Sequence, residues 1–222
     1  MVALSEQNLE ARAAFLRDAA EQAIGTLSGD RCLMVGAGSG YNTEEFGDYF
    51  DEVNALEIEP REFPDVVDHG IFADGTRLPY QDDVFDLTVA ISVIEHVVPP
   101  VNRPKLAEEM VRCTKPGGHV FFQIPNGRFP LELHTGLPLF HWIPGAKQVA
   151  IEMGYTGLKR VHIPSRAKLA RWVREAGADV IEERSFAYPS EAIPKYNQLY
   201  EVFDDIGVFR VFPFGHIVVG RV

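Results

Sequence analysis

The chain has few cysteines, few basic residues and no long apolar run, and each shortage excludes a class of protein. Its two cysteines, Cys32 and Cys113, cannot form a disulfide framework, so we expect a reducing compartment, the cytoplasm. The chain has only 21 Lys and Arg residues but 32 Asp and Glu residues, which gives a formal net charge of -11. A surface of that charge repels phosphate backbones, so bulk binding to nucleic acid is not expected. The apolar runs are too short to span a membrane, and the amino terminus lacks the basic start and apolar core of a signal peptide.

What the chain does contain is typical of a compact α/β protein. Hydrophobic residues make up 46% of the 222 positions and charged residues 24%. This length suits one domain spanning residues 1–222. Within it we expect an amino-terminal helix in residues 1–28, a ligand-binding half in residues 30–124, and two insertions on the substrate side, residues 125–164 and 187–213.

Short apolar runs alternate with helical patterns along the chain. Apolar residues recur at helical spacing from Ser5 until Gly25, and a second helix is expected over 104–113. Ser165 is expected to cap a third helix, with Gly177 just past its end. Strands are predicted over residues 31–35, 53–58, 70–73, 84–93, 119–124, 179–186 and 216–222. This alternation predicts a doubly wound, mostly parallel sheet with helices on both faces.

The two insertions break the regular alternation and are rich in aromatic residues. A loop as long as 125–164 inside a compact domain is usually functional or disordered, and its aromatic content argues against disorder. Such segments can simply be hydrophobic core beneath long loops. The sharper interpretation is a lid over a pocket for an apolar, aromatic or sugar-containing substrate.

A glycine-rich turn follows the first predicted strand directly. It reads Val-Gly-Ala-Gly-Ser-Gly over residues 35–40, where glycines allow sharp turns and close approach to a ligand. The dinucleotide fingerprint G-x-G-x-x-G would need a third glycine at position 41, which holds Tyr41. That spacing disfavours a nicotinamide oxidoreductase.

Acidic residues end the next two predicted strands. Glu57 ends the second strand and is expected to face the crevice beside the glycine turn, where a carboxylate can accept both hydroxyl protons of a ribose. Glu59 competes for this role, but alternation along the strand aims it at the other face. Asp74 ends the third strand and could accept a hydrogen bond from an exocyclic amine. Asp86, which begins the fourth, is expected to serve structure by binding N–H groups.

Six motifs in this order resemble the class I S-adenosylmethionine-dependent methyltransferases, most closely their small-molecule branch. They are Val-Gly-Ala-Gly-Ser-Gly (35–40), Leu-Glu-Ile-Glu-Pro (56–60), Ala-Asp-Gly-Thr-Arg-Leu-Pro-Tyr (73–80), Val-Phe-Asp-Leu-Thr-Val (84–89), Ile-Glu-His-Val (94–97) and Lys-Pro-Gly-Gly (115–118). The resemblance covers residues 30–126 motif by motif. It implies a Rossmann-like, seven-stranded sheet whose last strand, 216–222, is antiparallel.

The resemblance also implies a set of cofactor-binding residues. Gly36, Ala37, Gly38 and Gly40 would run beneath the methionine part of S-adenosylmethionine, and Glu57 would hold the ribose hydroxyls. Ile58 would pack against the adenine ring, and Asp74, with Gly75 beside it, would meet the adenine amine. Ile91 and Ser92 would line the sulfonium side of the cofactor. The product would be S-adenosylhomocysteine.

The chain departs from the family pattern at two places. Members usually carry an acid two residues before the first glycine, and this chain has Met34 there. The missing carboxylate keeps a second hypothesis open: a degenerate methyltransferase fold that acts as a binding or partner subunit. The stretch between Glu57 and Asp74, with Pro60 and Pro64, leaves little room for the usual helix.

Methyl transfer from a sulfonium is an in-line displacement in which positioning and exclusion of water do much of the work. The expected reaction moves the methyl group to a small-molecule, glycan or lipid-linked acceptor, through an oxygen, nitrogen or carbon atom. A hydroxyl acceptor benefits from a general base, for which His96, His134 and His141 are the candidates. A metal is not expected, because Ser92 stands where metal-binding relatives place a second acid. The oligomeric state stays open.

Overall fold

The computed structural model describes residues 5–129, 145–152, 161–193, 202 and 205–222. Within these residues one seven-stranded sheet has the order β3-β2-β1-β4-β5-β7-β6. Its strands are β1 (Gly29–Val35), β2 (Phe50–Glu57), β3 (His69–Phe72), β4 (Phe85–Ile91), β5 (Thr114–Pro125), β6 (Asp179–Phe186) and β7 (Gly215–Arg221). The first five are mutually parallel, and β7 is antiparallel to both β5 and β6. The predicted doubly wound sheet with an antiparallel last strand is confirmed.

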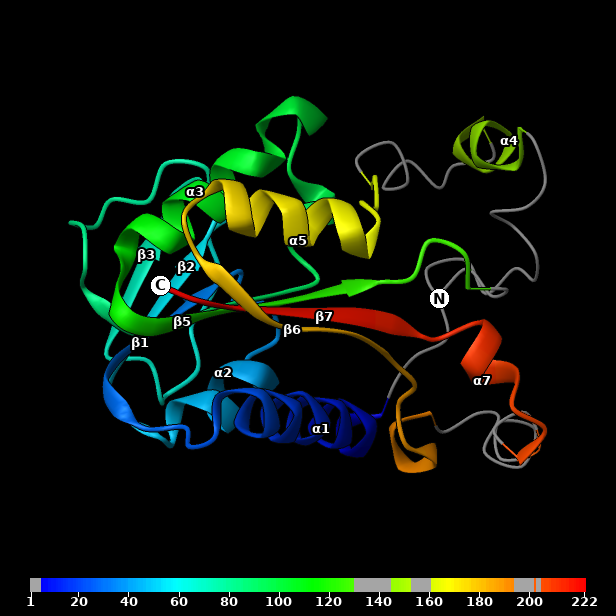
Figure 1. The fold of residues 1–222 in the computed structure, drawn as a ribbon, viewed down its shortest axis with the longest axis horizontal. Helices are drawn as coiled ribbons and strands as arrows, with labels where there is room; N and C mark the ends of the chain where they lie inside the picture. The colour runs from blue at the N-terminus through cyan, green and yellow to red at the C-terminus, as the bar shows by residue number, and fades with distance from the viewer. Residues whose placement is uncertain (1–4, 130–144, 153–160, 194–201, 203–204) are drawn as a thin grey trace.

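Helices cover both faces of the sheet (Figure 1). On one face lie α1 (Glu6–Ile24) and the seven-residue α2 (Tyr41–Gly47), and on the other α3 (Arg103–Cys113) and α5 (Arg166–Glu175). Alternation along the central strands divides the core accordingly. The α1 face buries Cys32, Met34, Phe46, Val89, Phe121 and Ile217, and the α5 face buries Leu33, Val35, Ala90, Leu106, Phe122 and Leu169.

The helix boundaries follow the caps that the sequence provides. Ser5 begins α1 by accepting a hydrogen bond from the backbone of Asn8, and Gly25 ends it with a positive φ of 103°. Ser165 caps α5 in the same way through the backbone of Lys168, and Gly177 follows its end with φ 107°. Together with α3, which covers the predicted 104–113, these helices lie where the sequence placed them.

The amino end of β5 corrects one expectation. We predicted a helix over 104–113 and a strand starting at 119, with Lys-Pro-Gly-Gly (115–118) between them. In the structure α3 passes directly into β5 at Thr114, and these residues form an irregularity in the strand, where the register against β4 shifts. A Cβ on Gly118 would lie 2.8 Å from the carbonyl oxygen of Asp86, so the strands approach too closely there for any residue other than glycine.

The substrate-side insertions are described only in part. They contain α4 (Ala146–Glu152), η5 (Ser190–Ala192) and the four-residue α7 (Val208–Val211). In Figure 1 α4 and α7 lie beyond the carboxyl ends of the parallel strands, on the right. His134, His141 and most of residues 125–164 fall outside the described residues, so the lid over that stretch stays a prediction. No helix in the described part of the chain is long and apolar enough to cross a membrane.

Candidate functional site

The glycine turn lies at the carboxyl edge of the sheet, between β1 and α2. Gly36, Gly38 and Gly40 all have positive φ angles, 74°, 60° and 94°, which only glycine adopts without strain. The backbone N–H of Gly36 donates to the carbonyl of Leu56 at 2.8 Å, so the turn packs against the end of β2. Ala37, within the turn, is 4% exposed and belongs to the core of the α1 face.

The three glycines of the turn differ in how much room a side chain would have at each position. A Cβ on Gly36 would lie 2.5 Å from the Val93 side chain, and one on Gly40 would lie 3.1 Å from Pro64. A Cβ on Gly38 would meet nothing nearer than the Gly36 carbonyl oxygen at 3.8 Å. Gly38 therefore borders space that no protein side chain of the described residues fills.

Glu57 is the last residue of β2 and lies directly against the turn. Its Oε1 accepts a short hydrogen bond from the Gly38 N–H, and it lies 3.7 Å from Nε of Arg61. The residue is 7% exposed, whereas Glu59 is exposed. The structure thus brings the acid at 57 to the turn and not the acid at 59, but the alternation argument for this choice was wrong, because residues two apart on a strand face the same side. Glu59 lies away from the turn because β2 ends at Glu57. Ile58, which follows, leaves 69% of its surface exposed beside this acid.

Asp74 and Gly75 lie at the same carboxyl edge of the sheet, just after β3, the strand next to β2. The N–H of Ala73 donates to the carbonyl of Glu57 at 2.9 Å, which brings the end of β3 beside the acid. Oδ1 of Asp74 accepts hydrogen bonds from the N–H and the hydroxyl of Thr76, both at 2.9 Å. That turn uses one carboxylate oxygen, and Oδ2 takes no part in it.

Ile91 and Ser92 lie at the end of β4, on the other side of the glycine turn. Ser92 has a φ of 54°, a left-handed conformation that is uncommon for residues other than glycine. Its N–H donates to the carbonyl of Gln123 at 3.0 Å, and its hydroxyl donates to Gln123 Oε1 at 2.9 Å. Gln123 was missed as a site residue, although a polar residue within the apolar run Val-Phe-Phe-Gln-Ile was a visible signal.

His96 is the one candidate base that the structure describes. It ends the short 3-10 helix η1 (Ile94–His96), where its side chain is exposed beside the buried Glu95. The N–H of His162 donates to the Glu95 carbonyl at 2.9 Å, and Nε of Arg103 donates to the Ile94 carbonyl at 3.0 Å. These contacts tie η1 to α3 and to the end of the 125–164 insertion. No group of three metal-ligating side chains occurs among the residues described.

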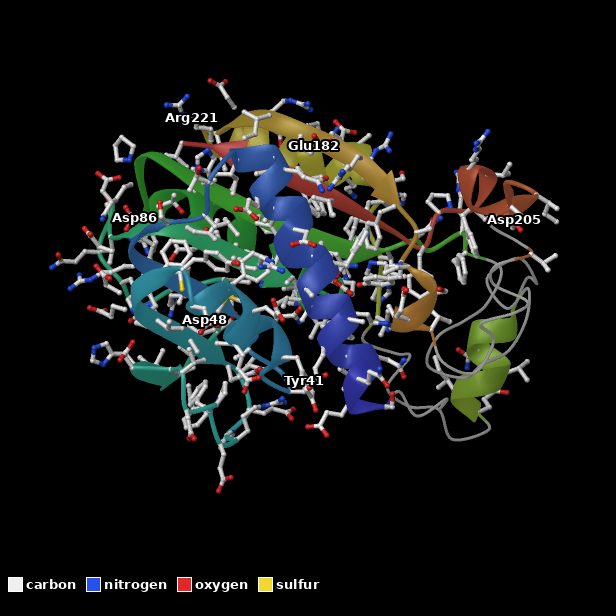
Figure 2. All side chains as sticks on the ribbon, turned by 90° about the horizontal axis from the view of Figure 1, so that it is seen from below. Tyr41, Asp48, Asp86, Glu182, Asp205 and Arg221 are labelled. Carbon is white, nitrogen blue, oxygen red and sulfur yellow. The ribbon has the colours of Figure 1, made fainter. Side chains whose placement is uncertain are left out.

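The position before the turn that usually holds an acid is buried here. Met34 is 2% exposed and packs in the core of the α1 face. Besides Glu57, two carboxylates of α1 lie near the residue that follows the turn. Tyr41 begins α2 beside the amino-terminal part of α1 (Figure 2), and burial together with the nearby carboxylates of Glu6 and Glu10 raises the pKa of its phenol.

A cavity of about 940 Å³ opens at the same edge of the sheet, beyond the end of β5. Its polar lining includes Asn126, Arg128, Ser165, Arg166, Ser185 and His216. The Arg166 guanidinium donates to Ser185 Oγ at 2.7 Å, and this hydroxyl lies 2.9 Å from Nδ1 of His216. Burial and the Arg166 charge lower the pKa of His216 to about 4, so its ring is neutral at pH 7. The sequence placed His216 only at the start of the last strand, and its place in a cavity wall was missed.

Asp86 and Lys115 lie at the opposite, amino-terminal edge and hold the framework. Asp86 Oδ2 accepts from the Arg31 N–H at 2.9 Å, and the Lys115 ammonium lies 2.9 Å from Oδ1. Although partial burial works against it, these two donors lower the pKa of the Asp86 carboxyl. The structural role expected for Asp86 is confirmed. The aspartate of motif 84–89 and the lysine of motif 115–118 therefore form an ion pair with each other.

The mostly parallel sheet, with a glycine turn after β1 and acids at the ends of β2 and β3, has the architecture of a Rossmann-like α/β protein. The family model described as "Methyltransferase domain" matches residues 7–183, and the chain belongs to that family. An "Uncharacterized methyltransferase" of Mycobacterium leprae is 37% identical over 122 residues, which cover 52% of this chain and 44% of that protein. The chain thus matches less than half the length of that relative.

Solved structures of low sequence identity share the fold. An S-adenosylmethionine-dependent methyltransferase from Mesorhizobium loti superposes with a TM-score of 0.63 at 16% identity, covering 93% of this chain and all of that one. The phosphoethanolamine N-methyltransferase 2 of Haemonchus contortus, in complex with S-adenosyl-L-methionine, also gives 0.63, at 12% identity over 93% of this chain and 52% of that one. At such identities the likeness concerns the fold.

Proposed function

We propose that the protein transfers a methyl group from S-adenosylmethionine to a small-molecule acceptor. The contact between the Gly38 N–H and Glu57 Oε1 carries this proposal, because it joins the glycine turn and the strand-end acid in one pocket wall. The family supplies the reaction class, since the matched model is a methyltransferase domain.

The residues at this edge fit the parts of the cofactor. The open side of Gly38 leaves space for the methionine part, and Oε2 of Glu57 is the oxygen proposed to accept the ribose hydroxyl protons. The exposed Ile58 offers an apolar surface for adenine, and Asp74 Oδ2 would accept from the adenine amine. Ile91 and Ser92 would border the sulfonium. When bound, the cofactor supplies an activated methyl group, and the chain's own part is to hold the acceptor in line and exclude water.

The acceptor side is proposed to lie over β5, β7 and β6. The net charge of -11 disfavours a nucleic-acid acceptor, and the aromatic side chains of the insertions suit an apolar or aromatic one. His96 and His134 stay the proposed bases for a hydroxyl acceptor. We propose the cytoplasm as the compartment, because both cysteines are buried free thiols.

A direct test incubates the protein with S-adenosylmethionine and fractionated small-molecule extracts and measures the release of S-adenosylhomocysteine. Release should depend on an extract fraction and should be lost in Gly38→Val, whose added side chain fills the open side of the turn. The absence of release from every fraction, with cofactor binding intact, would contradict the proposal.

A second function is favoured by one observation, the burial of Met34 in the apolar core. A chain without the usual carboxylate could bind the cofactor, or a partner, without turnover. In that case S-adenosylhomocysteine would bind and no fraction would support its release, so the same assay separates the two functions.

A further inference from the structure

A buried amide at the carboxyl end of β5 stands apart from the apolar core around it. Gln123 is 3% exposed, and its side chain lies on the α1 face in a row with Ile91 of β4 and Ile217 of β7, its partners across the sheet. An amide in such surroundings is expected to form hydrogen bonds through both of its ends, because polar groups removed from water are costly when unpaired.

Only one end of the Gln123 amide has a partner. Its Oε1 accepts from the Ser92 hydroxyl at 2.9 Å, whereas among the described residues its amide nitrogen donates to no acceptor. The nitrogen is also not among the side-chain atoms that are both fully enclosed and unpartnered in that part of the chain. It is therefore not completely enclosed, and its two N–H groups have no acceptor among those residues.

Ser92 fixes which way the amide points. Its backbone N–H and its hydroxyl both donate to Gln123, and it does so in the left-handed conformation with φ 54°. A non-glycine residue in that region is strained, and such strain concentrates at functional sites. The hydroxyl holds the side-chain Oε1 toward Ser92, whereas the backbone N–H bonds the main-chain carbonyl of Gln123, so the amide nitrogen points away from Ser92.

The neighbourhood of this nitrogen is suited to an organic ligand. Beside Gln123 lies the end of β4 with Ile91 and Ser92, which the proposed function places beside the sulfonium. The core of the α1 face, to which Ile217 and Ile91 belong, also holds an aromatic cluster of Phe129, Phe186, Tyr188 and Phe214, with ring centroids about 5 Å apart. Binding pockets are commonly apolar with a few fixed polar groups that orient the ligand.

We propose that Gln123 is an acceptor-positioning residue: its side-chain N–H donates a hydrogen bond to an oxygen of the acceptor substrate. The acceptor then carries a carbonyl, phenol or carboxylate oxygen near the atom that receives the methyl group. This inference rests on the proposed function and narrows its acceptor to oxygen-bearing compounds. Such a donor also rejects analogues that lack the oxygen, because binding them leaves the N–H unpaired.

The test follows the side-chain amide of Gln123 directly by 1H–15N NMR with S-adenosylhomocysteine present. The Gln123 resonances are identified by their absence in Gln123→Leu. The probes are p-cresol and acetophenone at millimolar concentration, with toluene and ethylbenzene as counterparts that lack the oxygen. The amide of Asn54 is the internal control, since it is 4% exposed and already bonded to Glu52 Oε1 at 2.9 Å.

We expect p-cresol or acetophenone to shift the Gln123 amide but not that of Asn54, with about tenfold weaker binding of the counterpart. Gln123→Glu keeps an oxygen for the Ser92 hydroxyl and loses the donor, so it should also bind the probe about tenfold more weakly while its affinity for S-adenosylhomocysteine stays unchanged. A role limited to holding Ser92 would leave probe binding intact in Gln123→Glu, which would overturn the proposal.

The remaining outcomes are also decisive. If S-adenosylhomocysteine binds by calorimetry but no probe shifts the Gln123 amide, this inference fails and the proposed function stands. If S-adenosylhomocysteine does not bind, the proposed function fails and the inference falls with it.

Discussion

Gly38 and Glu57, nineteen positions apart in the chain, are joined by a hydrogen bond from the backbone N–H of the glycine to the carboxylate Oε1. The bond links the turn after β1 to the end of the neighbouring strand β2. It fixes the orientation of a nearly buried carboxylate whose second oxygen is available to a ligand. The candidate cofactor site depends on this pairing more than on either residue alone.

Replacing Glu57 should therefore weaken cofactor binding. Glu57→Ala removes a charged hydrogen-bond acceptor, and we expect a loss of about 1–3 kcal/mol in the affinity for S-adenosylhomocysteine, measured by calorimetry. Glu59→Ala is the matched control, because the exposed Glu59 should be replaceable without effect. No loss in Glu57→Ala, with a loss in Glu59→Ala, would move the ribose contact to Glu59.

A side chain at position 38 should leave the fold intact but prevent cofactor binding. Gly38→Val adds atoms on the open side of the turn, so cofactor binding should be abolished while the fold is kept. Gly117→Val is the control for backbone strain, because Gly117 also has a positive φ, 84°, with no atom within 4 Å of its Cβ position. The measurement is calorimetric binding together with urea unfolding. Unchanged affinity in Gly38→Val would contradict the location of the pocket.

Asp86 should matter for stability and not for ligand binding. Asp86→Ala removes the acceptor for the Arg31 N–H and the partner of Lys115, and it should cost about 1–3 kcal/mol in the free energy of unfolding. Urea unfolding measures the loss, and calorimetry should show an unchanged affinity for S-adenosylhomocysteine. A large drop in affinity with normal stability would contradict the placement of this pair at the opposite edge.

His216 should make the stability of the folded protein depend on pH. Its pKa is lowered to about 4 in the folded protein, against about 6.5 in an unfolded chain. Between these two values the unfolded state binds more protons, so stability rises with pH and falls as the solution is acidified from about pH 6.5 toward pH 4. His216→Gln should reduce this dependence in urea titrations at several pH values. An unchanged slope would show that the ring is not held in its neutral form.

The sequence predicted the framework of this fold better than its side-chain contacts. Buried strands such as β1 and β4 are short apolar runs, and local caps such as Ser165 define helix ends, so both are visible in one stretch of chain. The pairing of Ser92 with Gln123 and of Ser185 with His216 joins neighbouring strands whose partners the sequence alone does not specify. The β5 irregularity at Gly118 was missed for the same reason, since it depends on the approach of β4. The roles of His96 and His134 stay predictions.

The most direct test of the account is calorimetric titration of the protein with S-adenosylmethionine and S-adenosylhomocysteine, with NADH as the control ligand. We expect micromolar binding of the sulfur nucleotides and none of NADH, because Tyr41 stands where the dinucleotide fingerprint requires a glycine. Absence of binding by either sulfur nucleotide would contradict it, and would mean that a chain with Met34 in place of the usual acid has lost or changed its ligand.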